Sequence, residues 1–168
     1  AIIVILIILS ICIYVVISNN RKQKQLFEYA YIDPVTKKGN IYYFRKKGQE
    51  ILEKRKAQEG NVTQYIAVLD INKFKMINKA YGYQMGDTIL YGIGEELEKI
   101  LGKESLISRY SNDYFAVLFE YEDNIRKIVN KLVRNIENLK IDSNVYNLSV
   151  NMGIYKLTDS DNNIAEAM

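Results

Sequence analysis

The sequence predicts an α+β fold, in which helices flank a central, mostly antiparallel sheet and an apolar N-terminal helix precedes it. Two observations predict this fold. Residues 1–17 contain no charged side chain, whereas the rest of the chain mixes charged and apolar residues. In that rest, short apolar stretches alternate with longer ones whose apolar residues recur every three or four positions. The resulting order, strand–helix–helix–strand–strand–helix–strand, is typical of a sheet covered by helices.

The apolar start of the chain is long enough to cross a membrane. A helix needs about 20 apolar residues to do so, with about 17 as the lower limit. A signal peptide would have a shorter apolar core and a small-residue cleavage site, and a buried strand or core helix is the other alternative. We expect residues 1–18 to form a transmembrane helix. Arg21, Lys22 and Lys24 follow it, and positive charge favours the cytoplasmic side.

Residues 19–30 are expected to connect this span to one domain over residues 31–168. Asp33-Pro34 and Lys38-Gly39-Asn40 have turn composition. The pattern then predicts a helix from Ile41 to about Gln58 that ends at Gly60-Asn61, and a buried strand over Thr63–Ile71 that places Asp70 at its carboxyl end.

The remaining elements follow from the same periodicities. We expect helices over Lys73–Tyr81, Asp87–Leu101 and Asn124–Leu139, strands over Leu106–Tyr110, Tyr114–Glu120 and Tyr146–Leu157, a hairpin turn at Ser111-Asn112-Asp113, and a last helix that begins near Asn162 and is cut by the chain end.

Composition excludes several classes of chemistry. Charged residues make up 26% and hydrophobic ones 48%, as in a folded protein, and the net charge of +3 is too small and scattered for nucleic-acid binding. The chain has no histidine and one cysteine, Cys12, which excludes Ser-His-Asp triads, His-ligated zinc and a disulfide within one chain. Catalysis would have to rest on carboxylates, metal ions held by oxygen, or backbone groups.

Three segments, in order, resemble the GGDEF family, the diguanylate cyclase domain. Tyr31 to Asn40 is similar to the family's opening pattern D-P-L-T-G-L-x-N. Leu69 to Asp87 resembles D-x-D-x-F-K-x-I-N-D-x-x-G-H-x-x-G-D at every spacing. Ser108 to Phe115 stands where the family has R-x-G-G-D-E-F, and the later Leu148 to Ile154 looks like v-S-x-G-i-a. The resemblance covers roughly Tyr29 to Met168 and implies a nucleotidyl-cyclase palm-like fold.

The resemblance implies the joining of two GTP molecules into cyclic di-GMP, with one GTP per domain and two domains facing each other. Phosphoryl transfer of this kind depends on positioning and on magnesium. By resemblance, Asp70, Asp113 and the Ile71 carbonyl are metal ligands.

By the same resemblance, Asn78 and Asp87 read guanine and Lys75 approaches the phosphates. Each of these three also has a plain structural interpretation. Asn78 could cap or turn a helix, Asp87 could be the N-cap of the following helix, and Lys75 could be a solvated surface charge.

The signature itself departs from the family pattern, because it reads Ser111-Asn112-Asp113-Tyr114-Phe115. Ser and Asn replace two glycines that favour close approach to phosphate, although Asn112 tolerates a left-handed conformation. Tyr114 replaces the second acid, and a phenol with a pKa near 10 neither binds metal nor activates a hydroxyl well at neutral pH. The family's product-inhibition motif R-x-x-D is absent from residues 102–105, so feedback at that site is not expected.

We therefore expect a degenerate, inactive GGDEF domain of a cyclic di-GMP signalling protein in a bacterial inner or plasma membrane, with the domain in the cytoplasm. It would bind GTP and magnesium, form a homodimer and regulate an adjacent output domain such as an EAL phosphodiesterase. A weakly active diguanylate cyclase and a purely structural dimerisation module are the alternatives.

Overall fold

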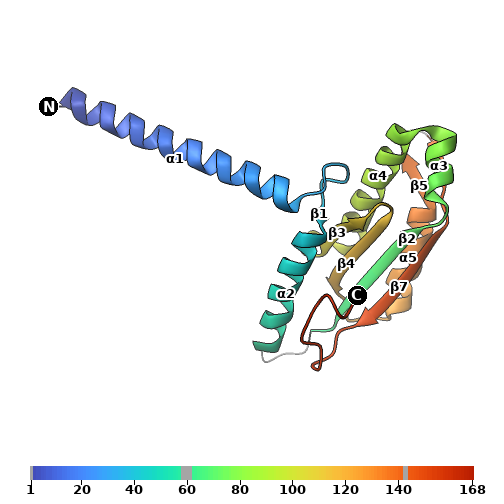
Figure 1. The fold of residues 1–168 in the computed structure, drawn as a ribbon. Coiled ribbons are helices and arrows are strands. Elements are labelled where there is room, and N and C mark those ends of the chain that lie inside the picture. Colours follow the sequence, from blue (N-terminus) through green and yellow to red (C-terminus); the bar gives the residue numbers. More distant parts are fainter. Residues whose placement is uncertain (1, 58–61, 142–143) are drawn as a thin grey trace.

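The computed structural model describes residues 2–57, 62–141 and 144–168, and Figure 1 shows a long helix projecting from a layered domain. The long helix, α1, runs from Ile2 to Tyr31 without a break, because neither Gly nor Pro interrupts it before Pro34. The predicted membrane span and the predicted connecting helix are thus one element. By length and a mean hydropathy of 2.9, α1 could cross a membrane, and a signal sequence would meet the same criterion.

A mixed five-stranded sheet forms the centre of the domain, in the order β1-β3-β4-β2-β7. Its strands are β1 (Gly39–Asn40), β2 (Gln64–Ile71), β3 (Leu106–Ser111), β4 (Tyr114–Glu120) and β7 (Val150–Lys156). The pairs β2–β4, β2–β7 and β3–β4 are antiparallel, whereas β1 lies parallel to β3. The predicted fold class is therefore correct.

Helices cover the two faces of the sheet unequally. Three of them, α3 (Phe74–Tyr81), α4 (Tyr83–Leu101) and α5 (Ile125–Glu137), pack on the face that carries Leu69 and Ile71. The other face carries Ile66 and Leu118 and packs against α2 (Ile41–Ala57) and against Leu157 and Ile164 near the C-terminus. Side chains alternate along a strand, so Asp70 lies on the same face as Ile66.

The strand predicted over Tyr146–Leu157 is wrong in its first part. Tyr146 belongs to β6 (Asn144–Asn147), which pairs with β5 (Asn138–Ile141) in a separate two-stranded sheet. The backbone N–H of Leu148 also donates to the Glu137 carbonyl, next to the Asn138–Asn147 pair, so Leu148 still contacts the small sheet before β7 begins at Val150.

Two predicted helix starts are also wrong. The fourth helix begins at Tyr83 after Gly82, whose φ of 84° favours glycine, so Asp87 lies inside the helix and is not its N-cap. Near Asn162 the chain forms only a turn, in which the Asn163 side chain accepts a hydrogen bond from the N–H of Ala165. The predicted end of α2 at Gly60-Asn61 lies outside the described residues.

Candidate functional site

Two carboxylates meet at one edge of the sheet. Asp70 is the penultimate residue of β2 and lies opposite Tyr114 in β4 and Asn151 in β7. Asp113 belongs to the turn between β3 and β4, directly before Tyr114. Burial raises the pKa of Asp113, and the charge of Asp70 raises it further, against the opposing effects of a backbone hydrogen bond and of Arg109 and Lys75. The side chain of Ile71 is buried, so only its backbone carbonyl could act as a metal ligand at this end of β2.

The hairpin turn survives without the family's glycines, as predicted. Asn112 adopts a left-handed conformation with a φ of 43°, which asparagine tolerates. The register between β3 and β4 shifts between Arg109 and Ser111, and the Nε of Arg109 donates to the Asn112 carbonyl at 2.7 Å. The arginine therefore supports the turn from which Asp113 projects.

The turn that follows α1 is tied to the same arginine. The Oδ1 of Asp33 accepts hydrogen bonds from the N–H groups of Val35 and Thr36, at 3.2 and 2.8 Å, and from the Thr36 hydroxyl. The same carboxylate contacts the Nη1 of Arg109 at 3.4 Å. The opening segment of the family pattern is thus linked to the signature hairpin.

Tyr114 lies opposite Asp70 in the pairing of β2 with β4. The charge of Asp70 raises the pKa of the Tyr114 hydroxyl, and burial and Asp113 add to the effect. The hydroxyl is therefore neutral at physiological pH and can act neither as a charged metal ligand nor as a base.

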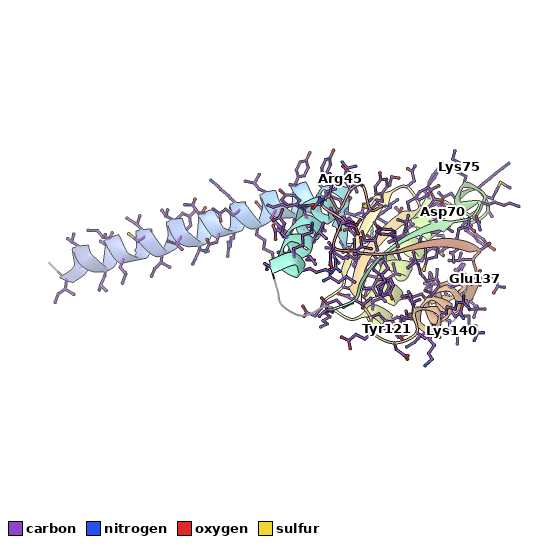
Figure 2. The ribbon with its side chains drawn as sticks, turned by 90° about the horizontal axis from the view of Figure 1, so that it is seen from below. Arg45, Asp70, Lys75, Tyr121, Glu137 and Lys140 are labelled. Atoms are coloured by element: carbon purple, nitrogen blue, oxygen red, sulfur yellow. The ribbon has the colours of Figure 1, made fainter. Side chains whose placement is uncertain are left out.

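The residues predicted to bind the nucleotide come from α3 and α4. Lys75 is exposed on α3, its charge lowers the pKa of Asp113, and Figure 2 shows it at the same end of the domain as Asp70. The Oδ1 of Asn78 is buried and has no hydrogen-bond partner among the described residues. A Cβ at Gly86 would overlap that oxygen, so the absence of a side chain at Gly86 makes room for the Asn78 amide.

Asp87 follows Gly86 on α4 and is exposed. The backbone carbonyl of Asn78 closes α3 by accepting the Gly82 N–H at 2.9 Å, whereas its side chain makes no cap. The amide of Asn78 and the carboxylate of Asp87 therefore come from adjoining helices, and neither caps a helix.

Sequence reasoning missed a polar cluster beside Asp70. The Oδ1 of Asn72 accepts from the Nδ2 of Asn151 at 2.8 Å, and its own Nδ2 donates to the Ser149 hydroxyl at 2.9 Å. These bonds tie the end of β2 to the start of β7. The sequence did contain one indication of this cluster, because Asn72 stands at the second acid of the D-x-D that opens the family pattern for Leu69 to Asp87.

Magnesium fits this edge only if a nucleotide completes its coordination. Among residues 2–57, 62–141 and 144–168, no group of three or more His, Cys, Asp or Glu side chains could hold a metal. Two carboxylates and a backbone carbonyl are nevertheless hard oxygen donors, and magnesium usually takes one or two carboxylates plus phosphate oxygens. Asp70, Asp113 and Ile71 would be those ligands.

The layered α+β fold, with carboxylates at the end of β2 and in the β3–β4 hairpin, has the architecture of a nucleotidyl-cyclase-like domain. The family model described as "Diguanylate cyclase, GGDEF domain" matches residues 30–168, and the chain belongs to this family. It therefore contains a GGDEF domain over residues 30–168.

Individual relatives agree with this assignment. The chain is 26% identical over 102 residues to diguanylate cyclase DgcS of Shewanella oneidensis, covering 61% of this chain and 34% of that protein. It is 34% identical over 100 residues to diguanylate cyclase DgcP of Pseudomonas aeruginosa, covering 60% of this chain and 14% of that protein. The chain thus spans about a third or less of these two relatives.

Solved structures show the same fold. The coiled coil and GGDEF domain of DgcB from Caulobacter crescentus, in complex with c-di-GMP, superimposes with a TM-score of 0.73 at 22% identity, over 95% of this chain and 85% of that one. The GGDEF domain of FimX from Pseudomonas aeruginosa gives a TM-score of 0.67 at 17% identity, over 82% of this chain and 86% of that one.

Proposed function

We propose that this GGDEF domain no longer makes cyclic di-GMP and instead binds magnesium and GTP as a regulatory module. The observation that carries the proposal is a split between two groups of positions. Asp70, Asp113, Asn78 and Asp87 match the family pattern, whereas Tyr114 occupies the position of the second signature acid.

The matching positions suit nucleotide binding. The buried Asn78 amide oxygen lacks a partner among the described residues, which costs free energy until a donor reaches it. The N–H groups of a guanine edge are such donors, and an exposed carboxylate at Asp87 can accept from the same edge. Lys75 and two carboxylates with magnesium would then lie at the phosphate end.

Tyr114, which differs from the family pattern, argues against catalysis. Charge stabilisation and hydroxyl activation both need an ionisable acid near the reacting phosphate, and the hydroxyl of Tyr114 stays neutral beside Asp70. A weakly active cyclase that uses Asp70 and Asp113 alone is the second candidate, because both carboxylates are present.

Isothermal titration of GTP with magnesium into the full chain in detergent micelles tests the binding. We expect saturable binding that Asp87→Ala weakens about tenfold or more, the effect of losing a charge-assisted hydrogen bond. Glu122→Ala, which removes an exposed carboxylate from the loop before α5, is the matched control and should leave the affinity unchanged. No binding at millimolar GTP would instead favour a structural dimerisation module.

Product analysis decides between the regulatory module and the weak cyclase. Incubation of the full chain with GTP and magnesium should give no cyclic di-GMP. Product that appears with the parent chain and disappears in Asp113→Ala would establish the weak cyclase and refute the loss of activity.

The apolar composition and length of α1 support a proposal for the setting of the domain. We propose that α1 anchors the chain in a bacterial inner or plasma membrane, that the domain lies in the cytoplasm as a homodimer, and that it regulates an output domain such as an EAL phosphodiesterase. Alkaline extraction of native membranes would release the chain if α1 does not span the bilayer.

A further inference from the structure

A cleft with a volume of about 450 Å³ lies between α3 and the small β5–β6 sheet. Ile77 and Tyr81 of α3 and Ile89 of α4 form one wall, and residues 144–148, which are β6 and the residue after it, form the other. The rings of Tyr81 and Tyr146 meet edge to face, with their centroids 6.1 Å apart. We call this space the β6 cleft.

The β6 cleft is separate from the candidate guanine site. Both places use α3, but successive residues of a helix are turned by about 100°, so Asn78 lies on a different side of α3 from Ile77. Asn78 and Asp87 do not line the cleft.

β6 is the free edge of its sheet, because among the described residues it pairs only with β5. The N–H of Leu148 donates to the Glu137 carbonyl, so this pair is a hydrogen-bonded one. Hydrogen-bonded and non-hydrogen-bonded pairs alternate along an antiparallel ladder. The register therefore places Val145 and Asn147 in non-hydrogen-bonded pairs, and their N–H and C=O groups point away from β5.

These outward backbone groups are available to another strand. In the part of the chain that the structure describes, the backbones of Val145 and Asn147 make no other hydrogen bond to a backbone group. The two residues lie about 7 Å apart along the strand, which is the repeat of an extended chain. Edge strands are usually shielded by charge or proline, and β6 contains neither. An extended peptide is the ligand whose hydrogen-bonding groups match this edge.

The two faces of β6 would treat the side chains of such a peptide differently. Tyr146 lies opposite Leu139, which is 3% exposed, and Tyr146 also contacts Tyr81, so this face is apolar. Val145 is 52% exposed and lies opposite the exposed Lys140, so the other face is open to solvent. A strand added to β6 would therefore place every second side chain in the apolar cleft.

Charge favours an acidic peptide as the occupant. No charged residue lines the cleft. The exposed Lys140 lies on the solvent face, and the exposed Lys73 lies one helical turn before Ile77, whose N–H reaches the Lys73 carbonyl at 3.4 Å. A second copy of the chain would bring its own uncharged β6 and the same two lysines, whereas carboxylates on a peptide would face opposite charge.

We propose that the β6 cleft binds an extended acidic peptide of a partner protein, which adds an antiparallel strand to the free edge of β6. The peptide backbone pairs with Val145 and Asn147. Its apolar side chains enter the cleft beside Tyr81, and its acidic side chains lie on the face of Lys140.

Fluorescence anisotropy of a fluorescein-labelled peptide of three Glu-Val repeats, added to the full chain in detergent micelles, tests this proposal, with empty micelles as the reference. We expect saturable binding that Val145→Pro weakens about tenfold, because proline lacks the N–H that would donate to the peptide. Proline is tolerated in an edge strand where the N–H points outward. Val145→Ala keeps this N–H, is the matched control and should leave the affinity unchanged. Equal thermal unfolding of the two variants shows that they are folded.

Two methylated peptides test the pairing with the parent chain alone, so this arm holds even if Val145→Pro lowers stability. In an antiparallel pair, residues directly opposite each other share a face, so the glutamates of the bound peptide are the residues whose N–H groups point to β6. N-methylation of the glutamate amides should weaken binding at least about tenfold, whereas N-methylation of the valine amides should be tolerated.

A third peptide tests the charge. Lysine in place of glutamate should weaken binding at least about tenfold, because it meets two lysines of like charge. The double substitution Lys73→Gln and Lys140→Gln should remove most of the difference between the acidic and basic peptides. Asp87→Ala should bind the acidic peptide as well as the parent chain does, because Asp87 lies outside the cleft.

Several outcomes would overturn the proposal. It is wrong if the acidic peptide does not bind, if the two methylated peptides bind alike, if Val145→Pro and Val145→Ala bind alike, or if the basic peptide binds equally well. If the parent chain sediments as a dimer and Val145→Pro as a monomer, a second copy occupies the edge and the peptide assignment is wrong.

Discussion

Arg109 contacts Asp33 at 3.4 Å, although 76 residues separate them in the sequence. Their side chains are 15% and 16% exposed, so water screens the pair only in part. The same guanidinium donates to the Asn112 carbonyl in the hairpin turn. One cation thus joins the segment after α1 to the turn that carries Asp113.

Replacing this arginine should destabilise the domain. Arg109→Ala removes a charge-assisted contact and the donor to Asn112, so we expect the free energy of unfolding to fall by about 2–3 kcal/mol. Urea unfolding of the full chain measures the change, with the exposed Arg126→Ala as control. If the free energy of unfolding falls no more than in the control, the contact between Arg109 and Asp33 does not stabilise the domain.

The two roles of Asp33 can be separated. Asp33→Asn keeps an oxygen for the N–H groups of Val35 and Thr36 but loses the charge that faces Arg109, whereas Asp33→Ala loses both. We expect the alanine variant to be less stable than the asparagine variant by about 1 kcal/mol. Equal unfolding midpoints would show that the turn needs no side-chain acceptor.

Gly86→Ala should disturb the candidate guanine site. A Cβ at this position overlaps the Asn78 amide oxygen, so the amide must move. We expect GTP affinity to fall about tenfold while helix stability changes little, because alanine favours helices. Calorimetric titration measures the affinity. Gly92→Ala on the same helix, where the new Cβ meets the end of the flexible Leu139 side chain at 3.3 Å, is the control and should leave the affinity unchanged.

Tyr114→Glu should increase the response to magnesium. A third carboxylate beside Asp70 and Asp113 repels both, so the melting temperature should fall by a few degrees without metal. Excess magnesium should then raise it by more than in the parent chain, since a cation neutralises the cluster. Tyr114→Phe supplies no charge and should respond like the parent, and identical magnesium shifts in all three proteins would contradict a metal site here.

Glu96 should make stability depend on pH in the acidic range. Burial opposes its ionisation, but hydrogen bonds from Asn135 and Lys99 outweigh this, and the pKa of Glu96 lies below its usual value. A lowered folded-state pKa gives stability that is present above the unfolded pKa and lost as the pH falls through the folded one.

Glu96→Gln should therefore cost up to about 1 kcal/mol near pH 7 and clearly less near about pH 3. Unfolding of the two proteins at both pH values gives the difference. The exposed Glu122→Gln should show no such dependence. A cost that is the same at both pH values would show that ionisation of Glu96 plays no part.

Much of the sheet could be predicted, because strands such as Thr63–Ile71 carry their own apolar pattern. The hairpin at Asn112-Asp113 was also predictable, since asparagine accepts the left-handed conformation that the turn requires. The start of α4 was not predictable from periodicity, because Asp87 is a good N-cap residue by type and the helix instead begins at Tyr83, after Gly82 at positive φ.

The features that could not be predicted depend on contacts between segments that are distant in the sequence. The pairing of β5 with β6 in a separate sheet, which the bond from Leu148 to Glu137 extends, is encoded by no local pattern around Tyr146. The Asn72 cluster likewise needs Ser149 and Asn151, which lie 77 and 79 residues away in the chain. The adjacency of Asp70 and Asp113 followed only from the family resemblance.

The unbroken α1 has a geometric consequence for how the domain is presented. Each residue of an α-helix advances the chain by about 1.5 Å and turns it by about 100°. One extra residue between Ser18 and Ala30 would hardly change the reach of the helix, but it would swing the domain through more than a quarter of a circle about the helix axis. Seven extra residues would restore nearly the original direction. The number of residues in α1 therefore sets which side of the domain faces a partner held on a neighbouring helix, and the same side returns about every seven residues.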